Sequence, residues 1–455
     1  MYLKKYNQAK ATHFLTLFNY TNGKKRGLFM PLSSLGLSSD IIKALKLKGY
    51  SKPTQIQSQL VPTLMSGRDV LAGAQTGTGK TAGFVLPILE KIMQKRKEGS
   101  GHYIQALIIV PTRELAKQVA QSTKEYSHFL PLTSMALYGG LPLASQKRTI
   151  DKGIDILVST PGRLIEHLER KNIDLNGVGY FVLDEADTIV DMGFRKEIAG
   201  IIRELTPKRQ NILISATLSP TLKELSHTLL IKPLQIEVAK MGATVDNLRQ
   251  VLHPVEQSKK LELLSYLIGS KNYQQALVFV RKKSEAEIVY KELIASGLKS
   301  ATIHGDKSSG ARSRALLDFK EKKVRVLVAT DIAARGLDIK GLDVVINYDI
   351  PHLTQDYIHR IGRTGRAGRE GLAIILSSPE ESVALSGVEK MLGSAIPKEV
   401  IEGYIPPKVE SKKGARSKNP AKKEKTAGAF GKKKKEQKPT SKKRKVTKRD
   451  GWGKR

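Results

Sequence analysis

The residue types best suited to chemistry lie in residues 74–81, a Gly-rich stretch that ends in Lys and Thr. Glycines in such a loop let consecutive backbone N–H groups turn toward phosphate oxygens, and a helix-compatible run from Ala82 would present its positive end. Lys80 would reach the terminal phosphates, and Thr81 would offer its hydroxyl to Mg²⁺. We therefore predict a phosphate-binding loop made of Ala74, Gln75, Thr76, Gly77, Thr78, Gly79, Lys80 and Thr81. Ala74 stands where the general pattern has its first glycine.

An acidic pair, Asp184 and Glu185, follows the apolar run at residues 181–183, where we expect a buried strand to end. Phosphoryl transfer depends mostly on positioning and charge neutralisation. Asp184 would hold hydrated Mg²⁺, and Glu185 would orient or deprotonate the attacking water. Taken alone, such a pair fits a helix N-cap with an acid in the first turn, but the phosphate loop favours the catalytic interpretation.

Basic side chains concentrate in residues 359–366, between glycines. Guanidinium groups form a fork that matches phosphate, so this turn suits an anion that arrives from outside, although a solvated basic surface is the alternative. If a second domain closes over the first, Arg363 and Arg366 would act as arginine fingers. Such a contact is worth about three to five orders of magnitude in rate.

These groups need elements that position them, and short apolar runs alternate with amphipathic stretches such as residues 114–129 and 284–296. This periodicity predicts an α/β fold built on parallel sheets. The runs that we expect to form buried strands are residues 70–72, 107–110, 156–158, 181–183, 212–214, 276–280, 326–328, 344–346 and 373–376.

Residues 239–247 contain Gly242 and little apolar content, and they interrupt the pattern as a linker would. We therefore expect one domain on each side of this stretch. The predicted divisions are an extension at 1–30, a first domain at 31–240, a linker at 241–248, a second domain at 249–400 and a basic tail at 401–455.

The composition excludes several classes of protein. The 455 residues include no Cys, which rules out disulfides, Cys-ligated metals and a catalytic thiol and favours a reducing, cytoplasmic location. We find no apolar stretch near the roughly 18 residues of a membrane span. With 78 Lys and Arg against 43 Asp and Glu, the net charge is +35. Nucleic acid is therefore the first expected partner, ahead of an anionic membrane surface or solubility alone.

Half of this charge lies in residues 411–455, which hold 20 Lys and Arg against 3 Asp and Glu. So few apolar residues cannot offset the entropy of ordering the chain, and we predict a disordered tail. Its function would be to anchor the protein on phosphates, and a merely solubilising tail is the alternative.

Together the motifs resemble the DEAD-box ATP-dependent RNA helicases of superfamily two. The matching segments, in chain order, are residues 49–57 (Q motif), 74–81 (motif I), 111–116 (motif Ia), 139–140, 160–163, 184–187 (the Asp-Glu-Ala-Asp signature), 215–217 (motif III), 329–338 (motif V) and 359–366 (motif VI). The likeness covers about residues 31–395, and within the family the chain resembles the compact bacterial RhlE-type members with basic tails.

The resemblance implies two tandem RecA-like domains, with ATP and Mg²⁺ between them and RNA across both. It assigns adenine stacking to Tyr50 and adenine pairing to Gln57, whose alternatives are a packed aromatic and a capping amide. It assigns further roles as follows: nucleotide and ribose binding by Gly336 and Asp338, water ordering by His359, and coupling of ATP to RNA by Asp187, Ser215 and Thr217.

The RNA-binding residues are also implied by the resemblance. They are Pro111, Thr112, Arg113, Gly140, Thr160 and Arg163 in the first domain, and Gly305, Arg312 and Thr330 in the second. Such residues grip sugar and phosphate, so we expect little sequence specificity; taken singly, each also fits a turn or cap. Two positions depart from the family pattern: Leu32, where an aromatic is usual, and Ser309, where Gln is usual.

We expect an RNA-dependent ATPase that closes on ATP and single-stranded RNA, bends one strand and so separates a short duplex locally. Ribosome assembly or RNA decay would be the setting, with ribosomal or decay-complex proteins as partners and no membrane. Two alternatives remain: an ATP-gated RNA clamp or annealing chaperone, and a DNA helicase, which the Q motif and the Asp-Glu-Ala-Asp spelling disfavour.

Overall fold

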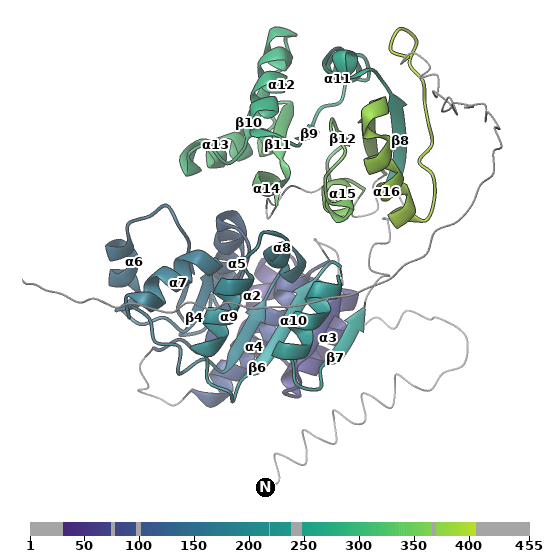
Figure 1. The fold of residues 1–455 in the computed structure, drawn as a ribbon. Helices are drawn as coiled ribbons and strands as arrows, with labels where there is room; N and C mark the ends of the chain where they lie inside the picture. Colours follow the sequence, from purple (N-terminus) through teal and green to yellow (C-terminus); the bar gives the residue numbers. More distant parts are fainter. Residues whose placement is uncertain are drawn as a thin grey trace, which may run out of the picture. The chain divides into compact units, whose positions relative to one another are not determined.

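Two parallel β-sheets organise the chain (Figure 1). The structure is a computed structural model of the 455 residues. It describes residues 31–73, 78–96, 102–217, 219–237, 248–335, 337, 339, 341–365 and 370–405, apart from the side chain of Ser309. We call residues 31–237 the first lobe and residues 248–405 the second lobe. The predicted α/β fold with parallel sheets is confirmed.

The sheet of the first lobe has the strand order β3-β4-β2-β5-β6-β1-β7, and all neighbours pair in parallel. Its strands are β1 (Val70–Gly73), β2 (Ala106–Ile109), β3 (Ser134–Leu137), β4 (Ile156–Ser159), β5 (Tyr180–Leu183), β6 (Gln210–Ser215) and β7 (Leu234–Glu237). Its helices are η1 (Leu32–Leu35), α2 (Ser39–Leu47), α3 (Gln55–Met65), α4 (Lys80–Lys95), α5 (Arg113–Tyr126), α6 (Leu143–Ile150), α7 (Pro161–Glu169), α8 (Ala186–Asp191), α9 (Arg195–Arg203) and α10 (Pro220–Leu229).

The sheet of the second lobe has the order β10-β11-β9-β12-β13-β8, again with parallel neighbours. Its strands are β8 (Leu248–Pro254), β9 (Ala276–Val280), β10 (Ser300–Ile303), β11 (Val326–Thr330), β12 (Val344–Asn347) and β13 (Gly371–Ser377). Its helices are η2 (Gln257–Lys259), α11 (Lys260–Ser270), α12 (Lys283–Ala295), α13 (Ser309–Lys320), α14 (Asp331–Ala334), α15 (Thr354–Ile361), η3 (Pro379–Glu381) and α16 (Ser382–Leu392).

Each sheet is buried on both faces, which explains the continuous apolar runs in the sequence. In β2, Ile108 packs into the core cluster on one face of the sheet, while Leu107 and Ile109 pack into the cluster on the other. In β9, Val278 and Phe279 divide between two clusters in the same way. Successive side chains of a strand point to opposite faces, so one apolar run supplies two cores.

Parallel strands bring all their carboxyl ends to the same edge of a sheet, the edge at which α/β proteins bind ligands. In the first lobe, the residues that directly follow β1, β4 and β5 are those singled out in the sequence, the motif at 111–116 begins two residues after β2, and the motif at 215–217 begins with the last residue of β6. In the second lobe, Asp331 follows β11 at the corresponding edge. The fold therefore gathers residues far apart in sequence without long loops.

Several predictions from the sequence fall on residues that the structure does not describe. These are the extension at 1–30, the basic tail from residue 406 and the linker up to residue 247. Leu248, which the predicted linker included, begins β8. Among the residues that are described, no helix has both the length and the apolarity needed to cross a bilayer.

Candidate active site

The phosphate loop is described from Thr78 onward, because residues 74–77 lie outside the described ranges. Gly79 is the N-cap of α4 and has φ 93°, in the left-handed region. A Cβ at Gly79 would lie 2.5 Å from Gln57 Nε2 and 2.9 Å from Thr54 Oγ1. Both the backbone angle and the close approach therefore require glycine here. Lys80, directly after it, is buried at the start of α4.

Gln57 joins the Q motif to the phosphate loop. Its Oε1 accepts from the backbone N–H of Thr54 at 3.0 Å, as part of the capping box that starts α3. Its Nε2 donates to the carbonyl of Gly79 at 3.1 Å. Both ends of the amide are thus engaged within the protein, as a capping amide would be, and adenine pairing by Gln57 remains a proposal.

Tyr50 follows α2 in a Schellman motif, in which Gly49 has φ 77°. The N–H of Tyr50 donates to the carbonyl of Leu45 at 3.0 Å, and that of Gly49 to Lys46 at 2.9 Å. The ring of Tyr50 packs against the first-lobe core, and Leu32 is a buried member of that core. Leu32, where the family usually has an aromatic, thus serves the core.

The acidic pair lies at the carboxyl end of β5. Asp184 and Glu185 are both buried, and Glu185 adopts φ 51°, an unusual angle for a residue with a side chain. Burial raises the pKa of both carboxyls, and the charge of Asp184 adds to the rise at Glu185, while Lys80 opposes both shifts. Asp184 Oδ1 also accepts from the N–H of Glu185 at 2.9 Å. A raised pKa makes Glu185 a better proton acceptor for water.

Asp187 binds the motif at residues 215–217. Its Oδ2 accepts from the N–H of Ala216 at 3.1 Å, and from the N–H and Oγ1 of Thr217 at 2.9 and 3.0 Å. Ser215 Oγ donates to the carbonyl of Thr217 at 2.6 Å. Burial would raise the pKa of Asp187, but the positive charges of His359 and Lys80 hold it below its usual value. The three coupling residues therefore form one hydrogen-bonded group.

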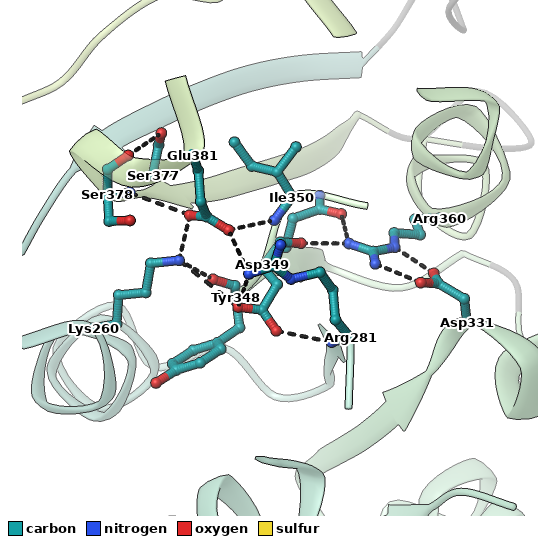
Figure 2. A network of polar contacts seen from close by, with 11 residues as sticks. Lys260, Arg281, Asp331, Tyr348, Asp349, Ile350, Arg360, Ser377, Ser378 and Glu381 are labelled. Carbon is teal, nitrogen blue, oxygen red and sulfur yellow. Dashed lines mark hydrogen bonds and ion pairs between the residues drawn. The ribbon is translucent and has the colours of Figure 1, made fainter. Parts of the chain in front are cut away.

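The arginine motif of the second lobe contains a buried residue, Arg360, to which the sequence assigned no role of its own. Figure 2 shows that Arg360 forms a two-pronged ion pair with Asp331, at 2.5 and 2.7 Å. Its Nη1 also donates to Asn347 Oδ1 at 3.0 Å and to the carbonyl of Asp349 at 2.6 Å. The guanidinium lies 5.1 Å from the centre of the Phe279 ring. Arg360 thus fixes motif VI to motif V.

Arg363 is also buried, and its Nη1 donates to the carbonyl of Leu337 at 2.5 Å. A solvated basic surface is therefore the wrong interpretation for Arg360 and Arg363. Arg366, Gly336 and Asp338 lie outside the described residues. Their assigned roles remain predictions.

Beside Arg360 lies a buried network of opposite charges (Figure 2). Lys260 is fully buried, and its Nζ donates to Glu381 Oε2 at 2.5 Å and to the carbonyl of Tyr348 at 2.9 Å. Asp349 Oδ2 accepts from the backbone N–H of Arg281 at 2.8 Å. Because the carbonyl of Asp349 also accepts from Arg360, this network connects to the arginine motif and helps to hold the Arg360 side chain in place.

The expected RNA-binding residues lie mostly at helix starts. Thr112, Thr160 and Thr330 are the N-caps of α5, α7 and α14. Thr160 directly follows β4, Thr330 ends β11, and Thr112 lies three residues after β2. Arg113 lies against Gly140, where a Cβ would be 2.5 Å from its Nη1. Pro111 is buried just after β2. The carboxyl edge of each lobe therefore presents hydroxyls, helix N-termini and guanidinium groups, which suit phosphates.

The remaining members of this set have protein partners or open surroundings. Arg163 pairs with Glu166 at 3.4 Å and is buried. Gly305 has open space where a Cβ would lie. Two predicted site residues of the second lobe contact the first lobe: Arg312 pairs with Glu114 of motif Ia at 2.5 Å, and His359 Nε2 lies 3.8 Å from Asp187 Oδ2.

Comparisons with known proteins agree with this arrangement. Residues 54–225 match the DEAD/DEAH box helicase model, and residues 259–368 match the helicase conserved C-terminal domain model. The chain is 39% identical over 354 residues to the DEAD-box ATP-dependent RNA helicase CshA of Bacillus subtilis, covering 78% of this chain and 71% of that protein. It is 40% identical over 359 residues to the ATP-dependent RNA helicase DeaD of Mycobacterium tuberculosis, covering 79% of this chain and 62% of that protein.

Two solved structures show the same fold. Dbp5 of S. cerevisiae, bound to RNA and ADP BeF3, superposes with a TM-score of 0.73 at 29% identity, over 82% of this chain and 95% of that chain. Mss116p, bound to ssRNA and AMP-PNP, superposes with a TM-score of 0.74 at 26% identity, over 84% of this chain and 82% of that chain. The two sheets therefore correspond to the tandem RecA-like domains of such structures.

Proposed function

Because the chain belongs to the DEAD-box family of ATP-dependent RNA helicases, we propose that it couples RNA-dependent ATP hydrolysis to local separation of short RNA duplexes or remodelling of RNA–protein complexes. The observation that carries this proposal is the acidic pair at the end of β5. There a buried Glu185 with a raised pKa lies beside Asp184, and the charge of Lys80 acts on both. This arrangement suits hydrolysis of a phosphoanhydride by water.

The residues that bind and hydrolyse the nucleotide have separate roles in this proposal. The phosphate loop holds the phosphates with backbone N–H groups, and Lys80 neutralises their charge. Glu185 orients the attacking water and accepts its proton. Tyr50 and Gln57 bind adenine, and Asp338 and Gly336 of the second lobe bind the sugar side of the nucleotide.

Mg²⁺ would be held by Asp184 and the hydroxyl of Thr81, and when bound it would neutralise charge on the transferred phosphate. In the described ranges, no three His, Asp or Glu side chains gather as a metal-ion site. A pair of ligands, Asp184 and Thr81, still fits Mg²⁺, because this ion commonly takes one or two protein ligands and completes its shell with phosphate oxygens and water.

The coupling of hydrolysis to RNA would run through Asp187. Its bonds to Ala216 and Thr217 connect the loop after β6 to α8, two residues from Glu185. Arg363 and Arg366 would stabilise the charge of the transition state, with His359 ordering the water. Hydrolysis would thus require the second lobe as well as the first.

The RNA contacts that we propose are to backbone and sugar. Thr112, Arg113, Gly140 and Thr160 lie at the carboxyl edge of the first sheet, and Thr330 lies at that of the second. Such contacts position a strand without reading its bases. Ribosome assembly or RNA decay in the cytoplasm is the setting that we propose, because the basic residues 411–455 favour long structured RNA.

Duplex separation tests this function directly. We would measure release of a labelled strand from a short duplex with ATP and with AMP-PNP, on matched RNA and DNA. We expect RNA strands to be released with ATP and repeated turnover to be lost with AMP-PNP. Equal release from DNA, or RNA binding that never separates strands at any ATP concentration, would contradict the proposal.

A further inference from the structure

Two tyrosine hydroxyls meet in the first lobe, and the scheme above uses only one of these residues. Tyr50 OH and Tyr126 OH lie 2.9 Å apart. The ring centroids are 6.2 Å apart with an interplanar angle of 88°, the edge-to-face geometry that aromatic pairs favour. Tyr126 is the last residue of α5, so residues 76 positions apart in the sequence are joined side chain to side chain.

The backbone of Tyr50 is already fixed by the Schellman motif after α2. A fixed backbone still leaves more than one staggered rotamer for the Tyr50 side chain, and the contacts of the ring select among them. Tyr50 is only partly buried, so core packing covers part of the side chain and not all of it. The hydroxyl bond and the edge contact with Tyr126 supply the remaining constraint.

Tyr126 is itself held rigidly. It is buried, with 3% of its surface exposed, and it packs in the first-lobe core. The ammonium of Lys48 lies 5.4 Å from the centre of its ring, and Lys48 also pairs with Glu125. Burial and the bond to Tyr50 raise the pKa of the Tyr126 hydroxyl, so it stays protonated at any working pH. A fixed neutral hydroxyl is a suitable anchor for another ring.

We propose that Tyr126 is a positioning residue for base selection. It holds the ring of Tyr50 in the orientation in which Tyr50 stacks on a purine. The inference rests on the proposed function, since it takes Tyr50 as the adenine contact. It adds a residue that touches no substrate and acts only through Tyr50, and it predicts that Tyr126 affects the binding of purine nucleotides selectively.

The test compares Tyr126→Phe and Tyr50→Phe, each of which removes one hydroxyl and keeps the ring. Fluorescent mant-ADP and mant-CDP would be titrated into each full-length protein. A typical hydrogen bond predicts that each variant loses about two- to ten-fold in mant-ADP affinity. Affinity for mant-CDP should stay unchanged. Because both substitutions break the same bond, the double variant should be no weaker than the single ones.

Tyr180→Phe is the matched control, because Tyr180 is buried in the same lobe and its hydroxyl has no hydrogen-bond partner in the described structure. It should leave both affinities unchanged. In steady state, Tyr126→Phe should raise KM for ATP and leave kcat at saturating ATP and RNA unchanged. A structural defect would lower kcat and weaken both nucleotides together.

Three results would overturn the inference: unchanged mant-ADP affinity in Tyr126→Phe, equal losses for the two nucleotides, or additive losses in the double variant. Failure of the proposed function would look different. In that case the unaltered protein itself would not bind mant-ADP, before any variant is compared.

Discussion

Glu185 is the residue on which turnover should depend most directly. Glu185→Gln keeps the size and the hydrogen-bonding capacity of the side chain but removes the proton acceptor. We expect ATP and RNA affinities to stay within about two-fold, and RNA-stimulated hydrolysis to fall by about 100-fold or more. Phosphate release under saturating RNA measures this.

Glu204→Gln, at an exposed glutamate of the same lobe, is the control for that substitution. It should hydrolyse ATP at the unaltered rate. Hydrolysis by Glu185→Gln at the same rate as this control would remove Glu185 from the mechanism.

Arg360 should matter for stability, because it is a buried cation held by Asp331, Asn347 and the carbonyl of Asp349. Arg360→Met leaves Asp331 without its partner, and loss of one member of a buried pair costs about 3 kcal/mol or more. Denaturant unfolding would measure this as a lower midpoint. Arg314→Met, at an exposed arginine on α13, should change the free energy of unfolding by less than about 0.5 kcal/mol.

Among individual residues, the sequence revealed those whose type and spacing form a motif, such as Lys80, Asp184 and Asp187. It could not reveal Arg360 or Tyr126 as anchoring residues. Their partners lie 29 and 76 positions away in the chain, so only the fold shows that they meet. The double use of Gln57, as a cap and as a link to Gly79, was likewise open until the structure placed both groups.

Among elements, the strands that the sequence missed share one property. The nine predicted strands all occur, whereas β3, β7, β8 and β10 were not predicted, and these are the outermost strands of the two sheets. Outermost strands have one neighbour and partly exposed residues, as in the β7 sequence Leu-Gln-Ile-Glu. They therefore lack the continuous apolar run that marks a strand buried on both faces.

Helix α12 carries a titrating group that should make stability depend on pH. Burial and a hydrogen bond with Asp349 raise the pKa of Glu285 from 4.5 to about 7. The folded protein then holds this proton more tightly than the unfolded chain. The free energy of unfolding should therefore fall as pH rises from about 4.5 to about 7.

Glu285→Gln keeps a neutral side chain at every pH, so it should remove this dependence. We expect a higher Tm than that of the unaltered protein at pH 8 and the same Tm at pH 4.5, measured by thermal unfolding. Glu292→Gln, on the exposed side of the same helix, should follow the unaltered protein at both values. If the Tm of Glu285→Gln and that of the unaltered protein change with pH in the same way, this proton linkage is excluded.

For the whole molecule, the distribution of charge predicts how RNA affinity responds to salt. Deleting residues 411–455 removes 20 basic and 3 acidic side chains, about half of the net charge. We expect weaker RNA binding and a shallower slope of log affinity against log salt concentration, because fewer counterions are released. Hydrolysis at saturating RNA should stay unchanged.

Fluorescence anisotropy at several salt concentrations would measure that slope. Replacing the same 45 residues by an uncharged linker of equal length separates charge from chain length. If this variant keeps the full slope, residues 411–455 do not contribute to RNA binding.

Because many of the site residues lie at the carboxyl edge of each sheet, the turns at the opposite edge are available for probes. Lys208 before β6 and Lys271 before β9 are exposed residues of such turns. Since the natural chain has no thiol, a cysteine introduced at each would be the sole attachment point for a dye in its lobe. Energy transfer between the two dyes in single molecules would then report how the distance between the lobes changes during each cycle of ATP hydrolysis.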